Sequence, residues 1–272
     1  MKRLMTLLVA LGIFGLLPGS SQASNRGIWI DSCFYDHTMV ADPIGQATHL
    51  HDFAGSKAIV DDSAAPDAMR AGGTSCVSVA DTSGYWVPQL YEDGNVVRPD
   101  GTNRDDLFYY TRQASGTVQT IPDGLKMVLG NAHAMDPSEE PGLGSKIFYK
   151  CGPDANKKFA QPPPSCTSGL MVLSFIFPNC WDGVNLDSVD HISHMAYPVA
   201  GACPADHPVN LPGLQGFWRY PVGKGPIGTI TLSSGAYYTA HMDFFNAWDP
   251  AKLQDLVNRC LDPSVNCGTN PT

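Results

Sequence analysis

Eight cysteines constrain the fold of this chain most strongly, because all of them follow an N-terminal segment that resembles an export signal. Residues 1–23 contain Lys2 and Arg3, then an apolar run too short to span a bilayer, then a Ser-x-Ala cleavage motif. We interpret them as a cleaved secretory signal peptide and expect a secreted protein, extracellular or periplasmic. An even number of cysteines in an exported chain predicts four disulfides, made from Cys33, Cys76, Cys151, Cys166, Cys180, Cys203, Cys260 and Cys267.

The spacing of these cysteines suggests two of the pairs, Cys260–Cys267 and Cys151–Cys166, which would close short loops. The connectivity of the other four stays open. No Cys-x-x-Cys pair occurs in the sequence, which argues against a thiolate zinc site or a redox dithiol.

The charge balance of the chain limits its partners. Removing Lys2 and Arg3 from the 17 basic residues leaves 15, against 26 acidic residues, a net charge of −11. Such a protein is a poor match for nucleic acid or an anionic membrane, whereas a polysaccharide or cell-wall glycan is compatible. No later apolar run is long enough to span a membrane and no linker divides the chain. We therefore expect one domain over residues 24–272, as a monomer.

Short β-branched and aromatic segments, separated by turns among 27 glycines and 22 prolines, predict a β-rich fold. Residues 24–75 are mostly small and polar, so we expect loop there. The predicted class is all-β, or β-rich with one C-terminal helix, as a disulfide-bonded sandwich or distorted barrel with long functional loops. The expected strands are 85–91, 96–97, 107–111, 125–129, 146–149, 170–177, 209–211, 216–220, 227–232 and 236–243.

Only the C-terminal region has a clear helical pattern. Asp249 can cap a helix whose first turn contains Pro250. One stripe of that helix is apolar: Leu253, Leu256, Val257 and Cys260.

Residues 177–198 contain the densest group of ionisable side chains in the sequence. They hold three aspartates, two histidines and a cysteine, and they show neither a helical nor a strand period. We expect an ordered loop that follows the apolar strand 170–177. Ordered polar loops of this kind often carry function.

Three segments pair imidazole with carboxylate: His49-x-His51-Asp52, Asp190-His191-x-x-His194 and His241-x-Asp243. In the first and third, a spacing of two on an extended chain presents both groups to one side. If the segments converge, they can hold one divalent metal, zinc or copper, with three or four nitrogen and oxygen ligands. The predicted ligands are His49, His51, His191, His194 and His241.

The same segments allow catalysis without a metal, because imidazole titrates close to neutral pH. For that reading the predicted catalytic residues are Asp190, Asp243, His194 and His241, with Asp190 and Asp243 as the carboxylate pair of a glycosidase. A structural role is the alternative, in which buried hydrogen bonds to these side chains fix the loop. His37, His133 and His207 lack such neighbours in sequence.

Aromatic residues offer flat apolar surfaces to sugar rings, although most aromatic residues belong to a core. The predicted substrate-binding set is Trp181, Tyr197, Trp218 and Trp248. No Gly-x-Ser-x-Gly elbow and no phosphate-binding loop occurs, which disfavours serine hydrolase and nucleotide chemistry.

Several of these motifs together resemble one family, the domain of unknown function numbered nineteen ninety-six. The resemblance spans roughly residues 33–262 and implies a secreted protein of a family common in fungi and present in bacteria, sometimes joined to WSC sugar-binding domains. Ala247 departs from the glycine expected there. The matching segments are Asp42-Pro-Ile44, His49-x-His51, Tyr85-Trp-Val-Pro-Gln-Leu-Tyr91, Gly124-Leu-Lys-Met127, 177–198, Cys203-Pro-x-x-His-Pro-Val-x-Leu-Pro212 and His241-x-Asp-Phe-x-Asn-x-Trp-Asp249.

Three functions fit the sequence. The first is a secreted hydrolase that acts on polysaccharide through a His/Asp site, metal-assisted or not. The second is a non-catalytic glycan-binding module. The third is a copper-dependent oxidative enzyme, for which an N-terminal histidine brace is disfavoured because the first histidine after Ala23 is His37.

Overall fold

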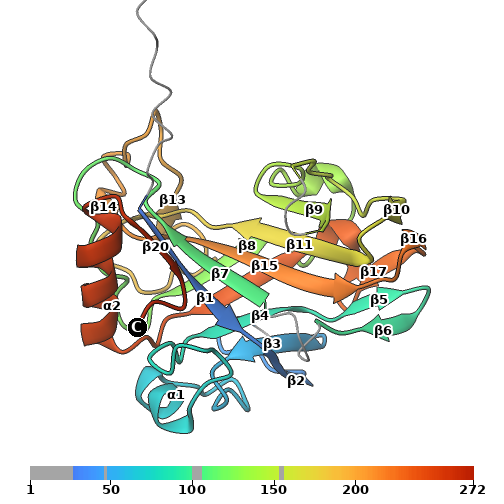
Figure 1. Ribbon diagram of the computed structural model, residues 1–272, viewed down its shortest axis with the longest axis horizontal. Helices are drawn as coiled ribbons and strands as arrows, with labels where there is room; N and C mark the ends of the chain where they lie inside the picture. Colours follow the sequence, from blue (N-terminus) through green and yellow to red (C-terminus); the bar gives the residue numbers. More distant parts are fainter. Residues whose placement is uncertain (1–26, 46–47, 100–105, 153–155) are drawn as a thin grey trace, which may run out of the picture.

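The computed structural model describes residues 27–45, 48–99, 106–152 and 156–272, so the predicted signal peptide lies outside the described residues. Two sheets stack face to face and form the body of the molecule (Figure 1). In spatial order, the six-stranded sheet contains β20 (Asn266–Thr269), β1 (Ile28–Cys33), β7 (Asp106–Thr111), β15 (Gly213–Pro221), β11 (Leu170–Ile176) and β9 (Ile147–Cys151). The five-stranded sheet contains β2 (Tyr35–Met39), β3 (His51–Gly55), β4 (Gly84–Pro88), β19 (His241–Phe245) and β8 (Lys126–Gly130).

Three smaller sheets extend this body. One contains β18 (Gly235–Ala236), β17 (Ile230–Leu232), β5 (Leu90–Glu92) and β6 (Asn95–Val97). A second contains β13 (Met195–Ala196), β12 (Cys180–Trp181) and β14 (Val209–Asn210), and the third pairs β10 (Ser165–Cys166) with β16 (Gly225–Pro226). The helices are α1 (Pro66–Gly72), α2 (Pro250–Leu256), the π-helical turn Val257–Leu261 and the 3-10 turns Pro137–Glu139 and Tyr237–Thr239.

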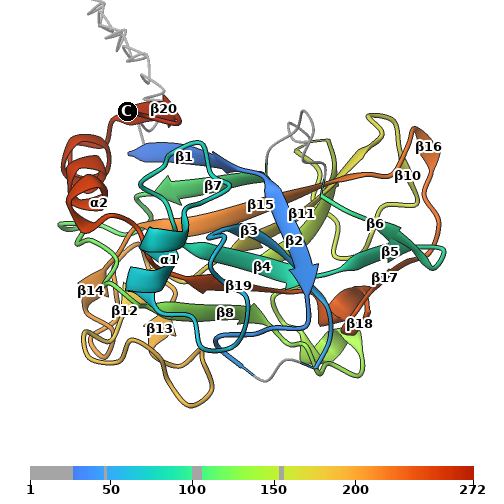
Figure 2. The same ribbon diagram turned by 90° about the horizontal axis from the view of Figure 1, so that it is seen from below.

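The five-stranded sheet separates two hydrophobic cores, because successive side chains of a strand point to opposite faces. On β19, Met242 and Phe244 point inward and pack in the large core between the two sheets. Phe245 points outward and joins a smaller core with Trp86 and with Met69 of α1. The outer face of this sheet is therefore covered near α1, as Figure 2 shows.

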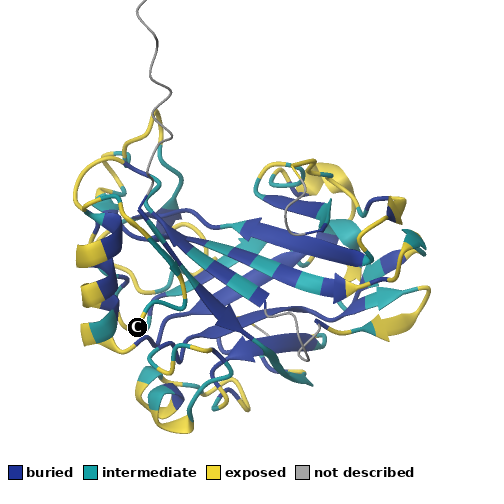
Figure 3. Ribbon diagram, in the orientation of Figure 1, coloured by how far each residue is buried: buried dark blue, intermediate teal, exposed yellow. Residues whose placement is uncertain are grey.

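The β-rich class with a C-terminal helix is confirmed, and Figure 3 shows the buried strands inside exposed loops. The side chain of Asp249 accepts a hydrogen bond from the backbone N–H of Lys252, which is the predicted N-cap. Residues 177–198 form the expected loop, apart from β12 and β13. Strand β11 is interior and buried on both faces, as its apolar sequence predicted.

Two expectations about secondary structure need refinement. Residues 24–75 contain long loops as expected, but β1, β2, β3 and α1 also lie there. Their polar residues are compatible with strands because long-range pairing to β7 and β4 supplies the backbone hydrogen bonds. The expected strand 236–243 is interrupted by the turn Tyr237–Thr239, and β19 begins at His241.

All eight cysteines form disulfides, and both pairs suggested by spacing are confirmed. The four bonds are Cys33–Cys76, Cys151–Cys166, Cys180–Cys203 and Cys260–Cys267. Within the described ranges, no helix is long and apolar enough to cross a membrane.

Candidate metal centre

The register of the five-stranded sheet brings two predicted histidines together. His51 on β3 pairs with Pro88 on β4. Asp243 on β19 pairs with Trp86 on β4, and continuing that register by two residues brings His241 level with Pro88. His51 and His241 therefore flank Pro88 on the outer face of the sheet. His49, two residues before β3 begins, completes the group.

The three imidazole rings converge through their Nε2 atoms. The Nε2 atom of His241 lies 3.1 Å from that of His49 and 3.3 Å from that of His51. On β8, Gly130 pairs with His241 at a φ of +111°. A Cβ atom at Gly130 would lie 2.3 Å from the carbonyl oxygen of Ala240, so this position requires glycine.

Backbone carbonyl groups orient two of the rings. The Nδ1 atom of His241 donates to the carbonyl oxygen of Thr239 (2.8 Å), and that of His51 donates to the carbonyl oxygen of Ala41 (3.1 Å). The neutral tautomers assigned by these bonds leave both Nε2 atoms without a proton, so two lone pairs face each other. The Nδ1 atom of His49 is bonded to the hydroxyl of Thr48, 3.1 Å away.

Burial favours the neutral imidazoles that bind metals. His51 and His241 are buried, and His49 is half-buried at the rim. Burial, with smaller contributions from neighbouring imidazoles, lowers the pKa of His51 well below its ordinary value. Burial lowers the pKa of His241 to about 3 and also lowers the pKa of His49. The three rings are therefore neutral at neutral pH, each with a single ring proton.

The donor set fits a divalent metal ion. Four nitrogen ligands about 2.0–2.1 Å from zinc in a tetrahedron lie about 3.3–3.4 Å apart. The observed Nε2 separations of 3.1 and 3.3 Å match this spacing. In each of the two oriented rings, the Nδ1–H group donates to an oxygen, as the second nitrogen of a metal-binding histidine usually does. Imidazole is a common ligand of both zinc and copper.

Asp243 lies beneath the histidines as a buried acid. Its Oδ2 atom is 4.0 Å from the Nε2 atom of His241 and has no hydrogen-bond partner among the described residues. Burial, with a smaller contribution from Asp42, raises the pKa of Asp243 well above its ordinary value. A divalent ion beside it would favour the carboxylate instead. The observed 4.0 Å exceeds the ligand spacing above, so Asp243 would support a bound ion through a hydrogen bond rather than as a direct ligand.

The structure does not bring the second predicted segment to this centre. His191 binds Asp187 through Nδ1 (2.8 Å), and His194 donates from Nε2 to the carbonyl oxygen of Lys126 (2.7 Å). Asp190 is exposed and accepts hydrogen bonds from Ser188 and from two backbone N–H groups, which lower its pKa. These side chains fix the loop 177–198 along β8.

The glycosidase pairing of Asp190 with Asp243 is likewise not supported. Asp190 borders a shallow surface depression together with Asp187 and Ser193. Asp243 is buried under His241 on the outer face of β19. Two carboxylates that act on one glycosidic bond must flank a common cleft.

The four predicted sugar-binding aromatics divide into two groups. Trp218 and Trp248 are buried in the large core and cannot stack on a ligand; Trp248 donates from Nε1 to the hydroxyl of Tyr110 (2.9 Å). Trp181 is half-buried and donates from Nε1 to the carbonyl oxygen of Asn185 (2.6 Å). Tyr197 is half-buried and borders two cavities.

Sequence reasoning missed two residues near the metal centre. Asp42 acts electrostatically on both His49 and Asp243, and His133 acts on both His49 and His241. Neither lies near these partners in sequence, so only tertiary structure reveals them. Asp42 does belong to the Asp42-Pro-Ile44 motif, which was the one available signal.

Together the fold and this site define a disulfide-bonded β-sandwich protein with a three-histidine metal-type centre on one outer face. The chain belongs to the family described as Domain of unknown function (DUF1996), whose model matches residues 39–248. That range includes all three histidines and Asp243. No curated protein and no solved structure matches the chain.

Proposed function

We propose that this protein is a secreted, metal-dependent hydrolase that acts on polysaccharide, with its ion bound by His49, His51 and His241. The observation that carries the proposal is the convergence of three neutral Nε2 atoms at the spacing of metal ligands. The four disulfides support export, because such bonds persist in oxidising compartments. The acidic charge of the mature chain supports a neutral polymer over an anionic one.

His49, His51 and His241 would hold the ion, which would supply a water activated for nucleophilic attack. The unpartnered Oδ2 atom of Asp243 is the acceptor that would orient this water and take its proton. That proton would pass to the leaving oxygen as the C–O bond of the glycoside breaks. The half-buried ring of His49 marks the side from which the site is reached.

The test is metal content and hydrolysis, measured on residues 24–272 with and without the His49→Ala/His241→Ala double substitution. We expect one equivalent of zinc or copper in the wild type and none in the double variant, together with metal-dependent release of reducing ends from laminarin, mannan or chitin. His207→Ala is the matched control, because His207 lies outside the histidine group and its Nε2 atom donates to the carbonyl oxygen of Ser193. Equal metal content in all three proteins, or none in any, contradicts the proposal.

Copper at the same ligands would support oxidative rather than hydrolytic cleavage, because three imidazoles suit both metals. The assay is therefore run with and without ascorbate under air. Products that form only with ascorbate would assign oxidation, and products formed without it assign hydrolysis.

A further inference from the structure

Two adjoining cavities lie on a part of the molecule that the metal centre does not use. The first, about 600 Å³, lies on the outer face of the six-stranded sheet and is bordered by Thr111, Gln113 and Gln215. The second, about 520 Å³, lies beside β8 and β9, which are edge strands of the five-stranded and the six-stranded sheet. Lys146 and Tyr197 border both cavities, so the two are neighbours along one path.

We propose that the two cavities form one groove that binds a neutral polysaccharide chain, with Tyr197 at its middle. The inference takes its substrate class from the proposed function, while its test measures binding alone. The second cavity also borders Gly130, which pairs with His241 across β8 and β19. One end of the groove therefore lies beside the strands that carry the metal centre.

The direction of the groove favours recognition by side chains. The lining residues come from successive strands of the six-stranded sheet, since Ile28 pairs with Thr111 and Gln215 pairs with Ile176. Strands β7, β15 and β11 are each paired on both sides. Their backbone groups are therefore unavailable to a peptide that binds by strand addition. A ligand that crosses these strands must be recognised by side chains.

Three of the polar side chains that line the first cavity are amides, those of Gln113, Gln215 and Asn266. An amide both donates and accepts hydrogen bonds, as does each hydroxyl of a sugar. The Nε2 atom of Gln113 is buried and has no acceptor among the described residues. If the amide rotates toward the cavity, a hydroxyl bound in the groove supplies the missing acceptor.

Gly213 makes room for the Gln113 side chain. A Cβ atom at Gly213 would lie 2.2 Å from Nε2 and 2.4 Å from Cδ of Gln113. An alanine at this position would therefore displace the amide from the groove floor. This provides a way to disturb the groove without removing any polar group.

Tyr197 and Lys146 form the boundary between the cavities. The hydroxyl of Tyr197 donates to the carbonyl oxygen of Ile176 (2.7 Å), which fixes the ring. The Nζ atom of Lys146 lies 4.0 Å from the ring centroid. A fixed aromatic ring with a neighbouring ammonium group offers sugars an apolar surface and a hydrogen-bond donor.

The charges along the groove favour a neutral polymer. Lys146 is the cation that borders both cavities, and Glu139 and Glu140 border the second one. A polyanion would meet these acids as well as the net negative charge of the protein. Uronate polymers are therefore expected to bind poorly.

The test is binding of the mature protein to laminarin and mannan, with polygalacturonate as the anionic comparison. We expect wild-type binding to a neutral polymer. Gln215→Ala and Gly213→Ala should weaken it about tenfold, the loss expected for one or two ligand hydrogen bonds. Tyr197→Ala should weaken it at least as much. Gln254→Ala on α2 is the matched amide control, since Gln254 is exposed and bonds only Asn258 in the described structure.

Metal content separates this inference from the proposed function. All groove variants should keep one equivalent of metal, and the His49→Ala/His241→Ala variant should keep polysaccharide binding. The groove proposal is overturned if the wild type binds neither neutral polymer, if polygalacturonate binds most tightly, or if Gln254→Ala weakens binding as much as Gln215→Ala.

Discussion

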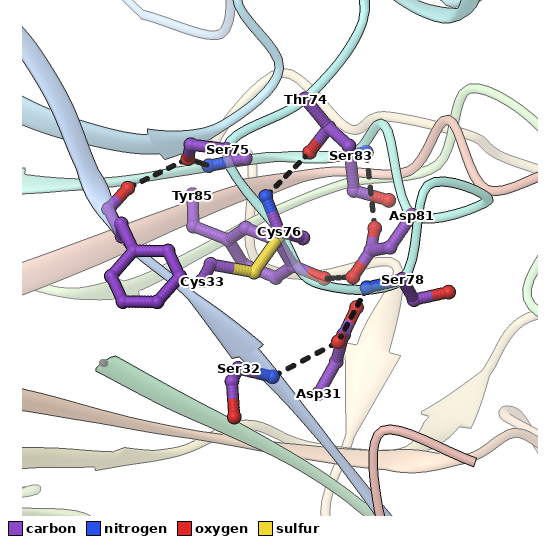
Figure 4. The surroundings of a disulfide bond; sticks show 12 residues. Asp31, Ser32, Cys33, Thr74, Ser75, Cys76, Ser78, Asp81, Ser83 and Tyr85 are labelled. Atoms are coloured by element: carbon purple, nitrogen blue, oxygen red, sulfur yellow. Dashed lines mark hydrogen bonds between the residues drawn. A yellow bond between two sulfur atoms is a disulfide. The ribbon is translucent and has the colours of Figure 1, made fainter. Parts of the chain in front are cut away.

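Two buried clusters of this protein contain the side chains that metal sites use, yet they differ in one decisive respect. In each cluster the potential ligand atoms lie within 4.8 Å of one another. The first is the histidine cluster, which comprises His49, His51 and His241. The second is the carboxyl cluster, which comprises Asp31, Asp81 and the disulfide Cys33–Cys76 (Figure 4).

The carboxyl cluster occupies nearly all of its own ligand atoms. Both sulfur atoms are in the disulfide. Asp81 accepts hydrogen bonds from the backbone N–H of Ser83 (3.1 Å) and the hydroxyl of Tyr85 (2.6 Å). The Oδ1 atom of Asp31 accepts from the backbone N–H groups of Ser32 (2.9 Å) and Ser78 (3.3 Å), and its Oδ2 atom has no partner among the described residues. Burial, with a smaller contribution from Asp81, raises the pKa of Asp31 to about 9, so Asp31 is a protonated acid at neutral pH.

In the histidine cluster, by contrast, the ligand atoms have only one another as partners. Its Nδ1 atoms are hydrogen-bonded to other groups, and its Nε2 atoms face one another without enough protons to satisfy all three. Proximity of histidine, cysteine and carboxylate is therefore weak evidence for a metal site. The stronger criterion is whether all the converging atoms lack partners outside the cluster.

The largest expected effect tests which cluster holds the metal. His51→Ala should lower metal affinity by more than about 100-fold, because even residues that only support a ligand contribute about 10–100-fold. Asp31→Asn/Asp81→Asn should retain one equivalent. Metal titration of the two proteins in parallel provides the measurement. Loss of metal from the aspartate variant alone would reverse the comparison.

The disulfide of the carboxyl cluster should contribute more stability than the shortest one. Cys33–Cys76 closes a loop with a sequence separation of 43, and Cys260–Cys267 one of 7. Loop-closure entropy then predicts losses of about 4 and about 2.5 kcal/mol for the paired Cys→Ser substitutions. Denaturant unfolding of both variants measures the difference. A larger loss for Cys260→Ser/Cys267→Ser would show that local strain or packing outweighs loop length.

The buried proton of Asp31 should make stability depend on pH. Because the pKa of Asp31 is higher in the folded state, the folded protein binds more protons between about pH 4 and pH 9. The contribution of Asp31 to stability is complete at low pH and is lost as pH rises, by at most about 1.4 kcal/mol per pH unit. The Asp31→Asn substitution keeps the size of this side chain but does not titrate.

Unfolding free energies at pH 5, 6, 7 and 8 test this effect. Asp31→Asn should gain stability relative to the wild type as pH rises. For the exposed control Asp255→Asn, the free energy of unfolding should change with pH as it does in the wild type. A constant difference between Asp31→Asn and the wild type across this range would show that folding does not raise the pKa of Asp31.

The sequence predicted local features of the candidate site better than its assembly. The spacing of two in His241-x-Asp243 correctly places both side chains on one face, because alternation is a property of the strand itself. Which segments converge depends on the register of β3, β4 and β19, and this register has no local signature. His191 and His194 have equally suggestive spacing but are held by Asp187 and Lys126.

Burial was the other property that local patterns could not supply. Trp218 and Trp248 are of the residue type expected on a sugar-binding surface, yet both are buried in the large core. The short disulfides were predictable because few residues separate their cysteines. Cys33–Cys76 was not, since it depends on how β1 approaches a loop 43 residues later.

The smallest expected effect on metal affinity concerns Asp243, the carboxylate beside the histidine cluster. Asp243→Asn keeps the size of the side chain and removes its ability to accept a proton. We expect metal affinity to change by less than about tenfold, because the 4.0 Å separation from His241 Nε2 places Oδ2 outside direct ligand spacing. The hydrolysis rate should fall about 100-fold or more, as is typical when a general base is removed.

Metal titration and kcat measured on the same Asp243→Asn preparation separate the two roles of this carboxylate. A fall in affinity that accounts for the whole loss of activity, with full activity restored by excess metal, would make Asp243 a fourth ligand. The histidine cluster would then be a closed four-ligand site, which is typical of structural zinc. Retained metal with lost turnover would instead establish an open centre, and the contrast with the carboxyl cluster, whose sulfur atoms are held in a disulfide, would extend from binding to catalysis.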